Sequence, residues 1–391
     1  MIWLAAVPAL YLLGAVFAPF PYWRTYFTLW RAPFSGGRAR LPWAARFRQM
    51  RFLLGYALAA PFITVLWYAD EILYPGYHKV RVQPVFILGQ PRSGTTFLHR
   101  TLASDDAKFV AARHIEWRLP YICLQKLIRN SSIARALLQK NYWSATPAGE
   151  VAARMHPNKL SDWEEDGIFF EECFLHHFFI FLRFPCPDLL DDLDDFTRLP
   201  AKVRHHILET HHRVIQKVLY LNGANGCRYL SKEVTSHSKF PEILEFYPDA
   251  EFIFSLRESP GFMNSLLALI RYSTMSKTGV DPDSVPGWRD AVIRRMQGDS
   301  RQLLAIIQEH VPADRRVLLT YGMVTGDIMA AAEKVYRHLG LSWEDADKSR
   351  LEQVRAAQPD RKRGYDYEKQ AFDGFSEFDD FVRRVGEDGK A

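Results

Sequence analysis

Three short apolar runs, separated by longer segments with helical spacing, organise the chain after residue 80. The runs are rich in β-branched and aromatic residues, which is typical of buried strands. They span residues 84–88 (PVFIL), 251–256 (EFIFSL) and 316–320 (RVLLT). Segments with helical spacing lie at residues 95–103, 201–220 and 327–339. Strands that alternate with helices predict an α/β fold, in which helices flank a parallel β-sheet of the P-loop type.

The amino-terminal part has a different pattern, because long stretches of it carry no charge at all. Residues 2–23 contain no charged side chain, and residues 52–69 form a shorter uncharged stretch that includes Pro61. Seven arginines lie between these stretches among aromatic residues, and no Asp or Glu precedes Asp70. About 20 apolar residues span a bilayer, and arginine on an aromatic background is typical of a segment at an anionic membrane surface.

We therefore expect residues 1–74 to form a membrane-associating segment with a transmembrane helix, and residues 75–391 to form the globular domain. Two other interpretations of the amino terminus stay open, namely a pair of buried core helices and a cleaved signal peptide. A signal peptide begins with a positively charged segment, whereas the arginines here follow the apolar stretch.

The side of the membrane depends on residues 52–69. By the positive-inside rule the arginines stay in the cytoplasm. If residues 52–69 lie in the membrane interface, the globular domain faces the cytoplasm. If residues 52–69 cross the membrane as residues 2–23 do, the domain lies outside the cytoplasm or in a lumen. We expect the cytoplasmic face, or the lumen in a eukaryotic secretory organelle.

The charge of the whole chain indicates which partners to expect. Its 391 residues carry a net charge of +5 and a pI of about 8.9. This mild excess is compatible with an anionic ligand or an anionic membrane surface, and it is too small for a nucleic-acid-binding protein. We expect membrane lipids as partners and no nucleic acid.

A glycine-containing loop follows the first expected strand, in the sequence FILGQPRSGTT at residues 86–96. Gly89 and Gly94 keep the spacing of the nucleotide-triphosphate loop G-x-x-x-x-G-K-[ST], but Thr95 stands in the place of the lysine. The nearest cation is Arg92. Such a loop directs backbone N–H groups and a helix dipole at an anion, and arginine can bind phosphate or sulfate oxygens in pairs.

A kinase or ATPase needs more than this loop. It requires the missing lysine and a magnesium ion held by an acid at a strand end. The strand at residues 251–256 is followed by Arg257, a cation. The sequence therefore predicts a site for an anion that needs neither that lysine nor a metal, such as a sulfuryl group bonded to a 5′-phosphate.

Two motifs resemble the sulfotransferases that use 3′-phosphoadenosine 5′-phosphosulfate (PAPS), in particular a bacterial-type branch. PRSGTT at residues 91–96 is similar to their 5′-phosphosulfate loop, P-[KR]-[ST]-G-T-[TS]. YPDAEFIFSLRESPGFMNS at residues 247–265 is similar to their 3′-phosphate segment, in which a serine follows the strand-closing arginine by eight residues; Arg257 and Ser265 have this spacing. The resemblance covers about residues 80–365 and implies the sulfotransferase fold, PAPS as the donor and no required metal.

The resemblance also implies a set of donor-binding residues in the loop, in the 3′-phosphate segment, after the third strand and in a basic tail. They are Arg92, Ser93, Gly94, Thr95, Thr96, Arg257, Ser265, Tyr321, Lys362, Arg363 and Gly364. The chain departs from the family in the segment that begins at Lys232, where the family often has Lys-Ser-Pro-x-His. Counted without gaps from Lys232, Ser236 takes the place of that histidine, so the role is not transferred to His237.

The reaction also needs a base for the acceptor. Relatives use a glutamate or a histidine, and the sequence ARHIEWRLP at residues 112–120 offers both. We expect catalysis by Glu116, with His114 as the second candidate and Arg92 stabilising the leaving phosphate; a structural ion pair of Glu116 with an arginine is the alternative. The acidic segment at residues 162–172 is more typical of an acceptor-site wall or a solvated face than of a catalytic segment. Residues 174–185 are typical of a hydrophobic core or of an apolar acceptor channel.

These features together predict a sulfotransferase that acts on a hydroxyl or amine of a lipid or glycan acceptor at a membrane. A P-loop kinase acting on a similar acceptor and a catalytically inactive membrane-bound relative are the alternatives. Acceptor identity is set by variable helices and loops, so the sequence does not predict it.

Overall fold

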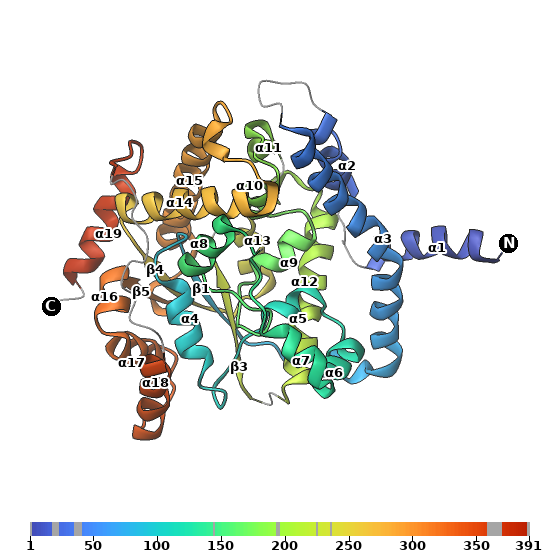
Figure 1. Ribbon diagram of the computed structural model, residues 1–391. Helices are drawn as coiled ribbons and strands as arrows, with labels where there is room; N and C mark the ends of the chain where they lie inside the picture. The colour runs from blue at the N-terminus through green and yellow to red at the C-terminus, as the bar shows by residue number, and fades with distance from the viewer. Residues whose placement is uncertain are drawn as a thin grey trace.

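The computed structural model describes residues 2–17, 23–34, 41–143, 145–192, 196–223, 226–234, 237–357 and 370–388. At its centre lies a five-stranded parallel sheet in the order β2–β3–β1–β4–β5 (Figure 1). The strands are β1 (Pro84–Gly89), β2 (Phe109–Val110), β3 (Arg228–Glu233), β4 (Glu251–Leu256) and β5 (Arg316–Thr320). The three strands expected from the sequence are confirmed as β1, β4 and β5, and the expected α/β fold is confirmed with them.

The search for apolar runs does not predict strand β3, because the carboxyl end of this strand is polar. Its sequence is RYLSKE, and a strand in the middle of a parallel sheet normally reads as an apolar run. Lys232 and Glu233 are nevertheless each 2% exposed. Because buried charges require partners, β3 ends in a place where the fold brings other charged groups together.

The two faces of the sheet belong to two cores. Val85 and Ile87 of β1 point into one of them, and Phe86 and Leu88 point into the other. The first core is covered by α4 (Thr95–Ala103), α17 (Ile328–His338) and α18 (Asp345–Ala357). The second is covered by α12 (Ala201–Leu221), α13 (Phe240–Phe246), α14 (Ser259–Thr278) and α15 (Trp288–Ala305). The predicted helices at residues 95–103, 201–220 and 327–339 are confirmed within about one residue.

Short helices line the long connection between β2 and β3. They are α5 (His114–Arg118), α6 (Ile122–Asn130), α7 (Ser132–Leu138), α8 (Pro147–Met155), α9 (Gly167–Glu172), α10 (His177–Arg183) and α11 (Pro187–Asp192). After β5, α16 (Tyr321–Gly326) follows directly, and α19 (Ser376–Asp388) packs near the same strand. These pieces surround the site described below.

The amino-terminal helices are α1 (Ile2–Phe17), α2 (Trp23–Leu29) and α3 (Trp43–Leu73). Helix α3 runs through Pro61, although proline lacks the N–H that would bond the carbonyl of Ala57. That carbonyl accepts a hydrogen bond from the Tyr11 hydroxyl of α1 instead. The proline therefore does not end the helix, and α1 is tied across it.

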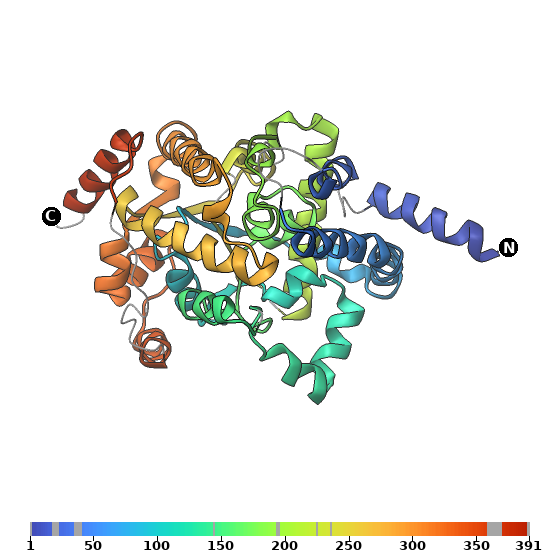
Figure 2. The same cartoon turned by 45° about the horizontal axis from the view of Figure 1, so that its top comes forward.

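Among the described residues, α3 is the one helix that is long and apolar enough to cross a membrane, by length and composition alone. This differs from the expectation that residues 2–23 are the membrane-length stretch. Helix α1 has 16 residues and residues 18–22 lie outside the described part, whereas about 20 are needed. Figures 1 and 2 show α3 running along one side of the body, with α1 extending away from it.

Candidate active site

The loop between β1 and α4 has a backbone shape that depends on glycine. Gly94 has φ 92° and Arg92 has φ 68°, both in the left-handed region. A Cβ on Gly89 would lie 2.2 Å from the carbonyl oxygen of Ser255 in β4. The Ser255 hydroxyl donates to the carbonyl oxygen of Ser93 at 2.8 Å. The loop is therefore fixed against β4, with the amino terminus and dipole of α4 behind it.

The structure brings the two donor motifs together. Arg92 Nε donates to Ser265 Oγ at 3.0 Å, and Arg257 donates from Nη1 to the carbonyl oxygen of Arg92 at 2.8 Å. The guanidinium of Arg257 also lies 3.9 Å from the centre of the Tyr321 ring. Four of the residues expected to bind the donor thus form one connected group at the carboxyl ends of β1, β4 and β5.

A wide cleft opens beside Arg257 and Tyr321, between the ends of β4 and β5 and the helices α16 and α19. Its walls combine charged groups with small and apolar ones, including Gly261, Met323 and Ala330. The basic tail residues Lys362, Arg363 and Gly364 lie outside the described residues. The cleft is large enough for a nucleotide and begins at the arginine expected to bind the 3′-phosphate.

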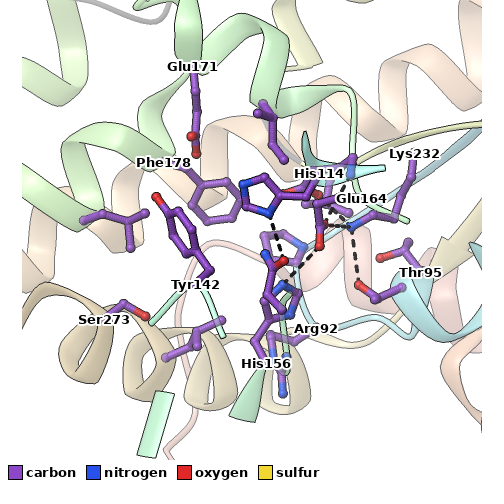
Figure 3. Close-up of a pocket in the computed structure, with 18 of the residues that line it drawn as sticks. Arg92, Thr95, His114, Tyr142, His156, Glu164, Glu171, Phe178, Lys232 and Ser273 are labelled. Carbon is purple, nitrogen blue, oxygen red and sulfur yellow. Dashed lines mark hydrogen bonds and ion pairs between the residues drawn. The ribbon is translucent and has the colours of Figure 1, made fainter. Parts of the chain in front are cut away.

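A second cavity reaches the same loop from the layer of short helices (Figure 3). Arg92, Thr95 and Thr96 line it on the side of the loop. Other side chains enter from α5, the segment before α9, α10, β3 and α14. They include His114, Glu165, Phe178, Leu182, Lys232 and Ser273.

The segment at residues 174–185 contributes both to the wall of this cavity and to the hydrophobic core. Phe178 and Leu182 line the cavity, whereas Phe174, Phe179 and Phe181 are buried in the core. The apolar wall of the cavity and the hydrophobic core are thus built from alternate faces of the same segment.

Lys232 connects the loop with two carboxylates inside this cavity. Its Nζ donates to Thr96 Oγ1 at 3.3 Å and to Glu165 Oε2 at 2.8 Å, and it lies 3.5 Å from Glu164 Oε1. Burial alone opposes a charge on this amine, but the two glutamates raise its pKa above the ordinary value. The lysine is therefore positively charged next to the loop between β1 and α4.

The two glutamates beside Lys232 differ in their protonation. Burial raises the pKa of Glu165 to about 7, and the negative charges of Glu164 and Glu233 act in the same direction. Although burial also opposes ionisation of Glu164, Lys232, His156 and Arg100 hold its pKa well below the usual range. Glu165 therefore exchanges a proton near neutral pH, whereas Glu164 stays ionised.

His114, the second candidate for the base, lines the cavity, and both of its ring nitrogens have partners. Nδ1 is hydrogen-bonded to Asn158 Oδ1 at 2.9 Å, and Arg118 Nε donates to Nε2 at 3.2 Å. Burial and the charge of Arg118 lower the pKa of His114 to about 4. The ring is neutral at physiological pH, and its accepting nitrogen faces a guanidinium.

Glu116 does not reach the cavity. Its side chain is 2% exposed, with Oε1 accepting from Arg129 Nη2 at 2.6 Å and Oε2 from the backbone N–H of Arg113 at 2.7 Å. It closes the first turn of α5 as a capping residue. The geometry agrees with the structural ion pair, which was the alternative to a catalytic role.

Lys232 and Glu165 are absent from the residues that the sequence singles out. Lys232 was visible as the first residue of the segment compared with Lys-Ser-Pro-x-His, but its strand was not expected. Glu165 belongs to the acidic segment at residues 162–172, whose sequence, considered without the fold, is typical of a solvated face. Only the fold shows that Glu165 is covered and lies next to a lysine.

Comparison with known proteins supplies independent findings. The sequence model of a family described as the sulfotransferase family matches residues 84–345, which is more than half of the chain. No curated protein sequence matches significantly.

Two solved structures resemble the whole fold. The sulfotransferase STF1 of Mycobacterium tuberculosis aligns with a TM-score of 0.66 at 16% identity, over 97% of each chain. The sulfotransferase STF9 of Mycobacterium avium aligns with a TM-score of 0.61 at 14% identity, over 94% of this chain and 95% of the other. At these identities the likeness concerns the fold, and it extends to most of the amino-terminal helices as well as the sheet.

Proposed function

Since the chain belongs to the sulfotransferase family, we propose that it transfers a sulfuryl group from PAPS to a hydroxyl or amino group of a membrane-associated lipid or glycan. One observation carries the proposal. Arg92, Arg257 and Ser265, from two separate motifs, meet at one point, and a cavity containing Glu165 and Lys232 adjoins that point. A donor site and an acceptor site therefore share the loop at residues 89–94.

The residues at the donor end fit the two anionic groups of PAPS. The backbone N–H groups of the loop, the amino terminus of α4 and Arg92 would hold the 5′-phosphosulfate. Arg257 and Ser265 would hold the 3′-phosphate, and Tyr321, stacked on Arg257 at 3.9 Å, limits the orientation of that guanidinium. When bound, PAPS supplies a sulfuryl group on a phosphate leaving group.

At the acceptor end we assign the base to Glu165. The acceptor oxygen or nitrogen forms a bond to sulfur while the bond between sulfur and the bridging phosphate oxygen breaks. The proton of the acceptor passes to the Glu165 carboxylate, and adenosine 3′,5′-bisphosphate leaves with the bonding electron pair. A carboxyl group with a pKa of about 7 suits this task, since half of it is ionised at neutral pH.

Charge that builds on the leaving phosphate oxygen needs cations nearby. Lys232 donates to Thr96 at 3.3 Å, and Arg92 belongs to the loop itself and lines the same cavity. Preorganised donors of this kind stabilise developing charge. We propose that these groups, without a metal ion, balance the charge of the reaction. His114, whose two ring nitrogens are held by Asn158 and Arg118, would form part of the cavity wall beside the acceptor.

The amino-terminal helices support the proposed acceptor class. An apolar, arginine-flanked segment attached to the catalytic fold favours an acceptor that resides in a membrane. We propose that the catalytic domain lies on the cytoplasmic face, or faces the lumen in a eukaryotic secretory organelle.

The direct test is incubation of the purified full-length protein with ³⁵S-labelled PAPS and fractionated lipids and glycans. The proposal expects label in a membrane lipid or lipid-linked glycan and none with the Arg257→Ala variant. Label confined to a water-soluble ester contradicts the membrane acceptor. Magnesium-dependent consumption of ATP would indicate a kinase, and binding of adenosine 3′,5′-bisphosphate without transfer to any fraction would indicate an inactive relative.

A further inference from the structure

Exposed large apolar side chains are concentrated at one end of the described structure. Thirteen of the seventeen lie between Val7 and Leu73, and none lies beyond Tyr220. On α3 they form a row at intervals of three, four or seven residues, which is one face of a helix. The row contains Trp43, Phe47, Leu54, Leu58, Phe62 and Val65. Exposed Arg51 lies on the same face between Phe47 and Leu54, and the stripe from Leu54 to Val65 carries no charge. A soluble surface rarely has such an apolar stripe.

The opposite face of α3 is fixed to the body at both ends. Near the start, Gln49 Nε2 donates to the carbonyl oxygen of Arg183 at 2.9 Å. Near the end, the Asp70 carboxylate accepts from the backbone N–H of Ile122 at 2.6 Å and of Cys123 at 2.9 Å, and it pairs with Lys217 at 3.0 Å. A helix anchored in this way has protein on one side along its 31 residues, so lipid can contact only its outer stripe.

Charge and the position of α1 indicate what covers the stripe. No acidic residue occurs before Asp70, and Arg48 and Arg51 are exposed at the start of α3. Helix α1 crosses α3 closely, because a Cβ on Gly14 would lie 2.4 Å from Thr64 Oγ1, and then extends away from the body (Figure 2). Arginines beside an apolar surface match an anionic bilayer.

The inner face of α3 leads toward the active site. Phe52 and Tyr56 line a small cleft together with Phe179 of α10. This cleft and the acceptor cavity share Arg118, Tyr142, Glu171 and Leu182 in their walls, so the two adjoin. The same helix therefore has its outer side toward the proposed membrane and its inner side on a passage to the reacting groups.

We propose that α3 lies flat in the bilayer interface and that an amphiphilic acceptor enters past it, with its apolar chain against Phe52 and Tyr56 and its polar head in the cavity of Glu165. This inference rests on the proposed function, which it deepens by specifying an acceptor with a single extended apolar chain. It also assigns α3 as an in-plane helix rather than a membrane span.

Membrane binding is tested with full-length protein and vesicles of phosphatidylcholine with about a third phosphatidylglycerol. Leu58 and Phe62 are 62% and 73% exposed on the protein surface. Leu58→Glu and Phe62→Glu should each weaken co-sedimentation about tenfold or more, because each replaces an apolar side chain that would be buried in the bilayer with a charged one. Leu58→Trp should bind as the wild type does. Gln353→Glu, which adds the same charge on an exposed position of α18, is the matched control and should also bind normally.

Access past α3 is tested by photo-crosslinking in the same vesicles, with benzoylphenylalanine in place of Leu58, Tyr56 or the buried Phe86. Adducts with lipid are expected from positions 58 and 56 and not from 86. Adducts from 58 alone overturn the passage, and adducts from neither position, or full binding by Leu58→Glu, overturn the membrane-facing assignment. If the vesicle results hold but no sulfate is transferred from PAPS, the proposed function fails while α3 keeps its membrane role.

Discussion

The two ends of the site, which we propose bind the donor and the acceptor and call the donor end and the acceptor end, are built in different ways. At the donor end, Arg257 directly follows β4 and Arg92 lies three residues after the end of the adjacent β1, so the backbone of these two strands sets their position. At the acceptor end, Glu165 precedes α9, and it meets Lys232 of β3 only because a long connection of short helices folds back over the sheet. The first arrangement is a property of the sheet, whereas the second depends on long-range packing.

This difference explains why the two ends tolerate change differently. The donor end is fixed by hydrogen bonds between strand-end groups that no other part of the fold can replace. The acceptor end consists of buried charges, in which the protonation of each group depends on its neighbours. Substitutions should therefore change turnover most sharply at the donor end and change its pH dependence at the acceptor end.

The largest effect is expected for Arg92→Ala. Removal of the guanidinium takes away a charge that stabilises the leaving phosphate, so kcat should fall about 10³-fold. Arg92→Lys should recover only part of this, because an ammonium group does not reproduce the paired donors of arginine. Steady-state transfer of label from PAPS checks both variants, and a loss below about tenfold would contradict the role of Arg92.

The second effect is expected for Glu165→Gln, with a fall in kcat of about 10²-fold. In the wild type, activity should rise with pH through about 7, because the carboxyl group must lose its proton before it can accept one. Below this pKa the group is protonated and inactive as a base. The variant should lack this rise, and a wild-type rate that does not change between pH 6 and 8 would exclude Glu165 as the base.

A smaller effect is expected for Gly94→Ala in the loop. With φ at 92°, an alanine would be strained by about 1 kcal/mol. We expect a lower melting temperature and a few-fold weaker binding of adenosine 3′,5′-bisphosphate. Gly298→Ala, in the interior of α15 with nothing within 4 Å of the added Cβ, is the matched control. It should lower neither the melting temperature nor the affinity for adenosine 3′,5′-bisphosphate. Equal behaviour of the two variants would show that the loop does not need glycine at residue 94.

The smallest effect on turnover is expected for Glu116→Gln. Since both oxygens of Glu116 serve the cap of α5 and the pair with Arg129, the variant should lose about 1 kcal/mol of stability or less and keep most of its activity. Thermal melting and transfer from PAPS measure the two properties. A fall in kcat as large as that of Glu165→Gln would return the catalytic role to Glu116.

The donor end could be predicted from the sequence because its signals are local. The glycine spacing in the loop, the apolar runs of β1, β4 and β5 and the interval from Arg257 to Ser265 all lie within short segments. The structure brings Arg92, Arg257 and Ser265 together, and their binding of a donor stays a prediction.

The acceptor end and the amino terminus could not be predicted in the same way. The burial of Lys232 and the partial burial of Glu165 depend on contacts between segments 67 residues apart, which a short stretch of sequence does not show. Pro61 lies inside α3, where a hydroxyl from α1 satisfies the carbonyl that the proline leaves without a donor. In both cases a distant part of the chain decides the outcome.

The most direct test of the central claim is a calorimetric titration of the full-length protein with adenosine 3′,5′-bisphosphate and with adenosine 5′-monophosphate. If Arg257 and Ser265 hold the 3′-phosphate of a nucleotide whose 5′ end lies at Arg92, the bisphosphate should bind at least about tenfold more tightly. The variant Arg257→Ala should bind the two nucleotides almost equally. Equal affinities in the wild type would contradict the account, because the two motifs would then not serve a single donor.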